Sequence, residues 1–354
     1  MKLWPLIIGL TLFGLIMVGN ASVVSSARVF GDKWHYLKLQ SVWAAVGLAG
    51  FAVASLFPLK LLQRSAMIFF IVTLLLLCLV LVPGVGVSAL GARRWLDLGF
   101  TSFQPSELAK LSLAVYLGVL FKSRPNFLKF IVPLSLLALL VVAERDFGTT
   151  SIILGMGFLT YFGMGGRLLP LLISLPIAAA AAVALIVFSP YRMARVTTFL
   201  NPASDPQGDS YQVRQALIGI GSGGLFGVGL GQSRQKFNFL PEVTTDSIFA
   251  IVAEELGLVG ASIVVMAFIY LSASGFRIAR RSTDPFSRAL AFSLTSWLSL
   301  QAFINLSALV ALLPFTGIPL PFISYGGTSL VVTLVASGLL VNISRGQAGY
   351  NRPK

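Results

Sequence analysis

Long apolar runs recur along almost the whole chain, and they constrain its fold more than any other feature. Each can cover roughly 30 Å of hydrocarbon, the shorter ones with help from flanking residues. A helix satisfies its own backbone hydrogen bonds, as a lipid environment requires. The pattern therefore predicts an all-α, polytopic membrane protein with ten transmembrane helices. The ten expected spans are Leu3–Gly19, Leu39–Phe57, Ala66–Val82, Glu107–Phe121, Phe127–Ala143, Thr149–Gly165, Leu168–Phe188, Ser247–Leu271, Phe286–Leu313 and Tyr325–Ile343.

The composition supports a membrane class and excludes several kinds of site. Of the 354 residues, 56% are hydrophobic and 11% are charged, whereas a soluble domain carries about 25% charged residues. Cys78 is the single cysteine and lies inside an apolar run, so the chain has neither a disulfide framework nor a thiolate metal site. His35 is the single histidine, which argues against a histidine-based metal site or proton relay.

The loops between the apolar runs alternate in basic charge, and this sets the expected orientation. With the N-terminus inside, the internal segments hold 14 Lys and Arg residues against six in the short external segments, and cytoplasmic loops carry such an excess. The first apolar run also resembles a signal peptide, but we interpret it as a retained helix because further spans follow. Both termini are then expected in the cytoplasm. The net charge of +14 reflects topology and anionic-lipid contact rather than nucleic acid.

One large polar stretch, Ser189–Asp246, lies between the seventh and eighth expected spans and faces outward in this orientation. The rest of residues 1–354 reads as a single membrane domain, so polar chemistry is expected at this loop. Its Arg192, Arg195 and Arg214 could bind anions, although a solvated loop would also be basic. Tyr211–Gly219 could form a short amphipathic helix on the membrane surface.

Glu242 and Asp246 close this loop, four residues apart and directly before the eighth expected span. A carboxylate held at a membrane surface near basic residues is a candidate general base. Asp is also favoured as the N-cap residue of a helix. The residues themselves leave these two interpretations of Asp246 evenly balanced. Glu254 and Glu255 follow inside the span, where a polar cavity would accommodate them.

Arg94 and Trp95 stand out in the second external loop, within the string Gly91–Asp97. Arginine offers a fork of donors that suits phosphate oxygens, and tryptophan suits a sugar face or a membrane interface. An ordinary interfacial Arg-Trp anchor would look the same. Taken alone, these residues favour the ordinary anchor, and a substrate contact is the alternative.

Glu107 and Lys110 are three residues apart, so they share one face of the fourth expected span. Charges inside a span are expensive and usually line a cavity. A buried ion pair that only fixes helix packing is the alternative.

Two further polar segments flank expected spans. Glu144–Thr149 follows the fifth span and could hydrogen-bond neighbouring loops, or it could be a solvated loop. Pro319–Ser329, which includes Ser324, begins the last span. Its proline and glycine density suggests a bent entry loop or a broken helix lining a cavity, with a simple loop-to-helix transition as the alternative.

Together these motifs resemble those of the SEDS proteins, the FtsW/RodA/SpoVE family of bacterial cell-wall polymerases. The resemblance covers nearly the whole chain, and the loop strings FLNP…DPQGDSYQ and LGQSRQKFNFLPE look closer to FtsW than to RodA. The matching strings, in family order, are GARRWLDLG, FQPSELAKL, RDFGT, YRMARVTTFLNPASDPQGDSYQ, GSGGLFGVGLGQS, FLPEVTTDSIFAIVAEELGLVG and PLPFISYGGTSL.

The resemblance implies a peptidoglycan glycosyltransferase of the bacterial cytoplasmic membrane, serving cell division or cell shape. It would polymerise lipid II with glycan on undecaprenyl diphosphate, forming β-1,4 bonds with inversion. The implied partners are a class B penicillin-binding protein, which crosslinks the strands, and other membrane proteins of the division or elongation machinery. No cofactor is required by the motifs, although a divalent cation such as Mg²⁺ or Mn²⁺ could help to stabilise the departing diphosphate.

The resemblance also assigns residues. The essential Asp of the family falls on Asp246, its fourth-helix Glu and Lys fall on Glu107 and Lys110, and its Arg-Trp pair matches Arg94 and Trp95. The family commonly has His-Thr-Asp-Phe around the Asp, whereas this chain has Thr244-Thr245-Asp246-Ser247, so a histidine neighbour is lost. With Asp246 as the catalytic base, the expected substrate-binding residues are Arg94, Trp95, Glu107, Lys110, Arg192, Arg195, Arg214, Glu242 and Ser324.

Two rival functions fit much of the same pattern. A lipid II flippase or other transporter would also carry intramembrane charges and a broken last span. A scaffold that only recruits its penicillin-binding partner would need no base at all. Glycan product made by purified protein in detergent would separate the enzyme from the transporter. The scaffold instead predicts that Asp246 substitutions leave cell growth unaffected while helix-surface substitutions break the complex.

Overall fold

The computed structural model describes residues 3–89, 92–97, 99, 101–123, 127–188, 193, 197, 199, 211–237 and 240–350. The described chain is mostly helical, and each of the ten expected apolar runs overlaps a helix. The helices are α1 (Trp4–Phe30), α2 (His35–Leu56), α3 (Leu59–Leu81), α4 (Pro105–Leu120), α5 (Phe127–Ala143), α6 (Phe147–Gly163), α7 (Leu168–Val187), α9 (Tyr211–Ser222), α10 (Ile248–Arg281), α11 (Pro285–Leu309) and α12 (Gly327–Tyr350).

Several of these helices have the length and surface of membrane spans. Within the described residues, α1, α2, α3, α10, α11 and α12 are long and apolar enough to cross a membrane, and α5 and α6 are apolar but shorter. Large apolar side chains such as Ile16, Leu56 and Leu75 are exposed on their outer faces. Such a surface is unfavourable in water but suits lipid. The chain is therefore an integral membrane protein, as the sequence predicts.

The all-α expectation misses a small antiparallel sheet between α3 and α4. Strands β1 (Gly86–Ala89), β2 (Ala92–Asp97) and β3 (Ser102–Phe103) pair in the order β1-β2-β3. The strands are short and the segment is rich in glycine and charge, so it resembles a loop in the sequence. Only pairing between neighbouring strands satisfies its backbone groups.

Helices α1, α10 and α12 extend at their C-terminal ends beyond the expected spans. The first helix continues from Gly19 to Phe30, because the hydroxyl groups of Ser22 and Ser25 bond to carbonyls three residues earlier instead of interrupting the helix. It ends where Gly31 adopts a left-handed conformation, with φ of 69°, and donates its N–H to the Ala27 carbonyl. This is a common helix terminus.

Helix α10 is interrupted near its start, at Gly257, whose φ is 66° and ψ is −168°. The loop before the helix fills the interruption: Leu258 N donates to Gly224 O at 2.9 Å and Val228 N donates to Glu254 O at 3.0 Å. A Cβ at Gly257 would lie 2.3 Å from the Gly227 nitrogen, so only glycine permits this approach. The break thus secures the long loop to α10.

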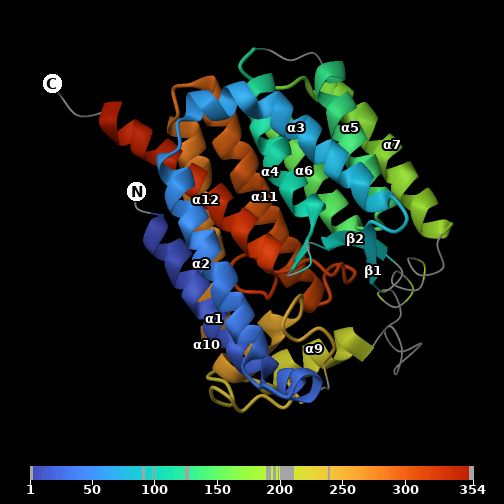
Figure 1. Cartoon of the computed structure of the whole chain (residues 1–354), viewed down its shortest axis with the longest axis vertical. Coiled ribbons are helices and arrows are strands. Elements are labelled where there is room, and N and C mark those ends of the chain that lie inside the picture. The colour runs from blue at the N-terminus through green and yellow to red at the C-terminus, as the bar shows by residue number, and fades with distance from the viewer. Residues whose placement is uncertain are drawn as a thin grey trace.

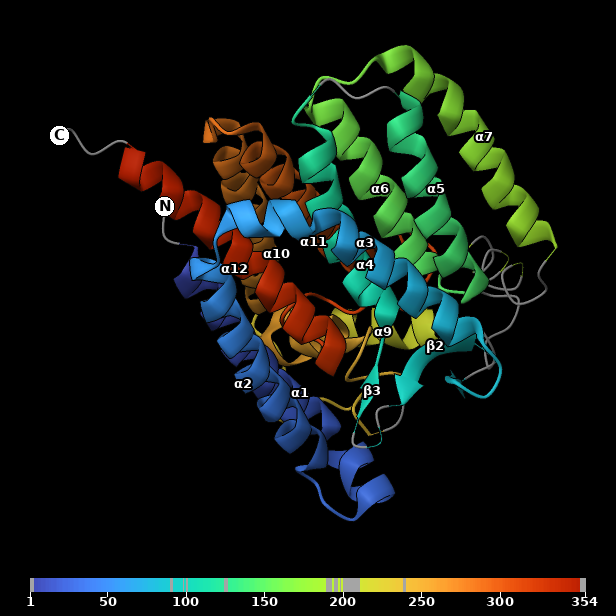
Figure 2. The same ribbon diagram turned by 45° about the horizontal axis from the view of Figure 1, so that its top comes forward.

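Helix α11 lies at the centre of the bundle and packs against α4, α6, α10 and α12. Helix α12 packs along α2, and α3 packs along α4 (Figure 1). Both views place α9 and the small sheet at the end of the bundle away from the chain termini (Figures 1 and 2). The expected amphipathic helix is present as α9, and the polar segments that flank the spans gather at this end.

Candidate active site

Asp246 lies directly before α10, at the end of the bundle that carries α9. The N-cap position of α10 is Ser247, whose side chain makes no capping hydrogen bond, so Asp246 is one residue outside the helix. Asp246 is buried, with 7% of its surface exposed. The N-cap interpretation therefore does not describe its position.

The main chain on either side of Asp246 is held by neighbouring elements. Asn305 on α11 donates its side-chain N–H to the Asp246 carbonyl oxygen at 2.8 Å. Tyr325 donates its backbone N–H to the Thr244 carbonyl oxygen, also at 2.8 Å. Both bonds join the entrance of α10 to other parts of the bundle, so the position of Asp246 depends on tertiary packing.

Two neighbouring hydroxyl groups lie near the Asp246 carboxylate. The hydroxyl groups of Thr245 and Ser247 each lie 3.4 Å from Oδ1, at the long end of hydrogen-bond distances. On the other side, a Cβ at Gly317 would lie 3.7 Å from Oδ2. Gly317 has φ of 69° and belongs to the loop that leads to α12. A Cβ there would be in ordinary van der Waals contact with the carboxylate, and the positive φ favours glycine.

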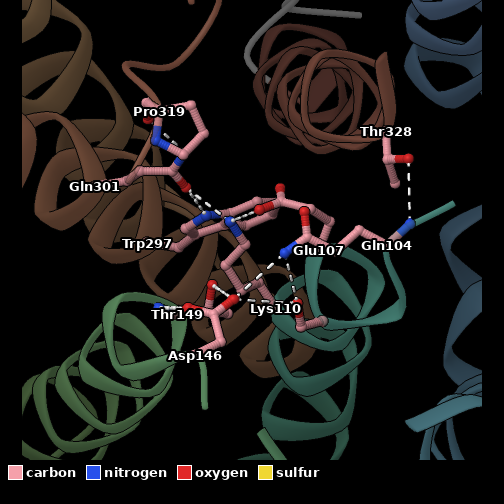
Figure 3. Close-up of polar contacts among 10 residues, drawn as sticks. Gln104, Glu107, Lys110, Asp146, Thr149, Trp297, Gln301, Pro319 and Thr328 are labelled. Atoms are coloured by element: carbon pink, nitrogen blue, oxygen red, sulfur yellow. Dashed lines mark hydrogen bonds and ion pairs between the residues drawn. The ribbon is translucent and has the colours of Figure 1, made fainter. Parts of the chain in front are cut away.

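Glu107 and Lys110 form the ion pair expected from their spacing on α4. Lys110 Nζ lies 2.8 Å from Glu107 Oε1, and the exposed fractions of the two side chains are 1% and 3%. Lys110 also donates to Gln301 Oε1 at 2.9 Å and lies 5.0 Å from the ring centroid of Trp297 (Figure 3). The pair is thus enclosed between α4 and α11 rather than exposed on a cavity wall.

Gln301 connects this ion pair to the loop before α12. Its Oε1 also accepts a hydrogen bond from Trp297 Nε1 at 2.7 Å, and its Nε2 donates to the Pro319 carbonyl at 3.0 Å (Figure 3). Glu107 Oε2 is buried without a hydrogen-bond partner among the described residues. The network is therefore well connected through Lys110 and incomplete at Glu107.

Asp146 begins α6 and ties it to the start of α4. Its Oδ1 accepts from Thr149 N at 3.0 Å, which makes it the N-cap residue. Its Oδ2 accepts from Gln104 Nε2 at 3.3 Å (Figure 3). The expectation that this segment hydrogen-bonds a neighbouring loop is confirmed.

Arg94 is placed by an irregularity in the sheet. Val87 pairs with Trp95 and Ser88 pairs with Arg93, so Arg94 is the extra residue of a bulge. Bulges redirect side chains, and Arg94 donates to the Arg145 carbonyl oxygen at 2.7 Å. Its Nε is buried without a partner among the described residues. Trp95 is half-buried on the same strand.

Glu144, next to this contact, is a buried acid with unusual properties. It is 1% exposed, and neither carboxyl oxygen has a hydrogen-bond partner in the described part of the chain. Burial, together with the charge of Asp146, raises the pKa of Glu144 to about 9 despite the opposing effect of Arg94. The side chain is therefore a neutral acid at pH 7.

The remaining expected substrate contacts are dispersed. Arg192 and Arg195 lie outside the described residues. Arg214 is exposed on α9, and Glu242 is exposed with φ of 50° and accepts from the Thr245 hydroxyl at 2.9 Å. Ser324 is buried, and its hydroxyl oxygen accepts from Leu320 N at 2.8 Å, so it stabilises the loop before α12.

Glu254 and Glu255 do not line a cavity. Glu254 accepts backbone N–H groups of Arg234 and Gln235, at 2.9 Å and 3.4 Å. Glu255 pairs with Lys236 at 3.3 Å. Both carboxylates hold the long loop against α10. Among the described residues, no three His, Cys, Asp or Glu side chains lie close enough together to hold a metal ion.

The sequence matches the family model named for FtsW, RodA and SpoVE, described as "Cell cycle protein", over residues 1–349. The chain belongs to the FtsW/RodA/SpoVE family.

Curated relatives within the family carry the FtsW name. "Probable peptidoglycan glycosyltransferase FtsW" of Thioalkalivibrio sulfidiphilus is 42% identical over 343 residues, covering 94% of this chain and 86% of the relative. The protein of the same name from Coxiella burnetii is 40% identical over 354 residues, covering 96% and 95%. The sequence-based placement closer to FtsW is confirmed.

Solved structures share the fold. The chain resembles one in a structure described as "Structural coordination of polymerization and crosslinking by a peptidoglycan synthase complex", with a TM-score of 0.76, 27% identity and coverage of 99% and 98% of the two chains. It also resembles the rod shape determining protein RodA of Thermus thermophilus, with a TM-score of 0.72, 28% identity and coverage of 98% and 96%.

In this member of the FtsW/RodA/SpoVE family, sequence reasoning missed three residues of α11 that connect the α4 ion pair, the loop before α12 and the Asp246 segment. They are Trp297, Gln301 and Asn305, which recur every four residues. A signal was present, because side-chain amides inside an apolar run are uncommon and usually hydrogen-bonded. The sequence does not reveal which carbonyls they contact.

Proposed function

We propose that this chain is a peptidoglycan glycosyltransferase that polymerises lipid II, with Asp246 as its general base. The names of its relatives and its similarity to a chain of a peptidoglycan synthase complex support the activity. The observation that carries the residue assignment is the position of Asp246. It lies outside the helix cap, at the polar end of the bundle, on a main chain held by Asn305 and Tyr325.

In the proposed reaction, glycan on undecaprenyl diphosphate is the donor and lipid II is the acceptor. Asp246 removes the proton from the 4-hydroxyl of the acceptor, and that oxygen attacks the anomeric carbon of the donor. The carbon–oxygen bond to the diphosphate breaks with its electron pair, and undecaprenyl diphosphate leaves. A new β-1,4 bond forms with inversion. Positioned general bases contribute about 10²- to 10⁴-fold to such steps.

Arg94 is the described residue best suited to meet the departing diphosphate. Its side chain is redirected by the bulge in β2, and its Nε has no partner among the described residues. An arginine fork suits phosphate oxygens and can stabilise the charge that develops on them. The buried pair Glu107–Lys110 contributes by holding α4 against α11 rather than by direct contact with substrate.

We further propose that all ten expected runs span the bacterial cytoplasmic membrane, with both termini inside and residues 189–246 outside. The excess of Lys and Arg in the inner loops supports this orientation. The proposed partner is a class B penicillin-binding protein, because the similar complex joins polymerisation to crosslinking. Other membrane proteins of the division or elongation machinery are further proposed partners.

The test compares purified wild type with Asp246→Asn in detergent, using lipid II as substrate. Asp284→Asn is the matched control, because Asp284 caps α11 through Ser287 N at 2.9 Å and is not part of the site. We expect glycan strands from wild type and Asp284→Asn, and a rate lower by at least about 100-fold for Asp246→Asn. Normal polymerisation by a folded Asp246→Asn protein would show that Asp246 is not the general base. Wild type that folds and makes no glycan in detergent would favour the transporter or scaffold.

A further inference from the structure

Asn305 makes two hydrogen bonds that meet at the proposed base. Its Nδ2 donates to the Asp246 carbonyl at 2.8 Å and to the Ile318 carbonyl at 2.7 Å. A carbonyl oxygen only accepts, so both contacts require the amide nitrogen and define how the side chain is oriented. One amide thereby joins α11, the entrance of α10 and the loop before α12.

The acceptor side of the same amide is not used in the described chain. Asn305 is 3% exposed, and its Oδ1 is buried without a hydrogen-bond partner. Leaving a buried acceptor unsatisfied is unfavourable. The described contacts of the Asn305 amide are therefore made by its N–H groups, and both of these donate to backbone carbonyls next to the Asp246 carboxylate.

The two joined elements flank the Asp246 carboxylate. Ile318 follows Gly317, the residue whose Cβ position is 3.7 Å from Asp246 Oδ2. Asn305 thus fixes the backbone that carries the carboxylate and the backbone that lies against it. Tyr325 N, which donates to Thr244 O at 2.8 Å, holds the same two segments together on the other side.

Asn305 also belongs to a continuous row on α11. Gln301 lies one turn earlier, bonds the adjacent Pro319 carbonyl at 3.0 Å and accepts from Lys110 at 2.9 Å. Residues four apart share a helix face. Gln301 and Asn305 therefore connect the α4 ion pair to the Asp246 segment through one face of α11.

We propose that Asn305 is a positioning residue for glycosyl transfer, which acts by holding Asp246 and the Ile318 loop at a defined separation. The inference rests on the proposed role of Asp246 as the base. Displacing a reacting group by about 1 Å can lower a rate by roughly 100-fold. Loss of this amide should therefore reduce the chemical step more than substrate binding.

The experiment measures kcat and the apparent KM for lipid II in purified Asn305→Leu, which keeps the approximate shape and removes both donors. Asn342→Leu is the matched control, because Asn342 Nδ2 also bridges two carbonyls, those of Ala54 at 2.9 Å and Phe57 at 2.7 Å, near the turn between α2 and α3. Melting temperatures in detergent compare the structural loss in the two variants.

We expect Asn305→Leu to lower kcat by roughly 10- to 100-fold with a KM change of less than about threefold. Asn342→Leu should lose a similar amount of stability and keep the wild-type kcat. If Asn305→Leu keeps the wild-type kcat, or changes only KM, the positioning role is refuted.

A second variant, Asn305→Ser, keeps one short donor and decides the question if Asn305→Leu does not fold. We expect a reduced kcat with an unchanged KM, and wild-type turnover would refute the proposal. Asp246→Asn separates the two hypotheses. If Asp246→Asn is inactive while the Asn305 variants turn over normally, only the positioning role fails. If Asp246→Asn is active, the base assignment fails first.

Discussion

Removing the charge of Lys110 should destabilise the bundle far more than removing the whole ion pair. In Lys110→Met, the Glu107 carboxylate loses the donor at 2.8 Å, and its other oxygen already has no partner within the described residues. Gln301 Oε1 loses the donor at 2.9 Å but keeps Trp297 Nε1 at 2.7 Å. The principal loss is therefore a buried carboxylate without a counter-charge.

The size of the effect follows from this geometry. Breaking one side of a buried ion pair costs about 3–5 kcal/mol, whereas replacing both partners by neutral groups of similar volume is close to neutral. For an unfolding entropy of about 2.1 cal/mol/K per residue, the single variant should melt about 4–7 °C below wild type. The double variant Glu107→Gln/Lys110→Met should melt within about 2 °C of wild type.

The assay is thermal unfolding of wild type, both single variants and the double variant in one detergent, followed by lipid II polymerisation. A cycle of four proteins isolates the coupling between the two residues. If Lys110→Met melts at the same temperature as wild type, the Glu107 carboxylate is not held as a buried charge, and the predicted destabilisation is refuted. If the double variant is stable and active, the pair fixes packing, whereas a stable but inactive double variant gives it a direct role in catalysis.

Two further predictions can be tested by the same thermal unfolding assay. Glu144 holds its proton to a pKa of about 9 in the folded protein against 4.5 as the ordinary value, so the folded state binds more protons between these values and wild-type stability falls as pH rises through this window. Glu144→Gln should melt above wild type at pH 8, by a margin that vanishes near pH 4, and parallel melting curves across this pH range would contradict the buried neutral acid. Gly257→Ala should lower the melting temperature by several degrees, because its Cβ would lie 2.3 Å from backbone in a left-handed conformation. Gly221→Ala, with nothing within 4 Å, is its control and should be neutral or stabilising; equal melting of the two would argue against the close approach at the α10 break.

Much of the helical framework follows from the chain itself. A long apolar run in lipid has to satisfy its backbone hydrogen bonds internally, and a helix does so within the run. The Glu107–Lys110 contact was predictable for the same reason, since residues three apart on a helix are neighbours whatever surrounds them. The amphipathic helix at Tyr211–Ser222 is also a local property. The sheet between α3 and α4 was missed because its strands gain their stability only by pairing with each other.

What the sequence determined by itself is the membrane class, the approximate positions of the helices, the family and the identity of Asp246 as a candidate base. All of these depend on local pattern or motif. Whether Asp246 caps α10, whether Glu107 and Lys110 face a cavity, and which carbonyls Asn305 binds were decided only by tertiary structure. These properties depend on contacts between segments far apart in the chain, such as Asn305 with Asp246, and no periodicity within one segment encodes where its polar side chains find their partners.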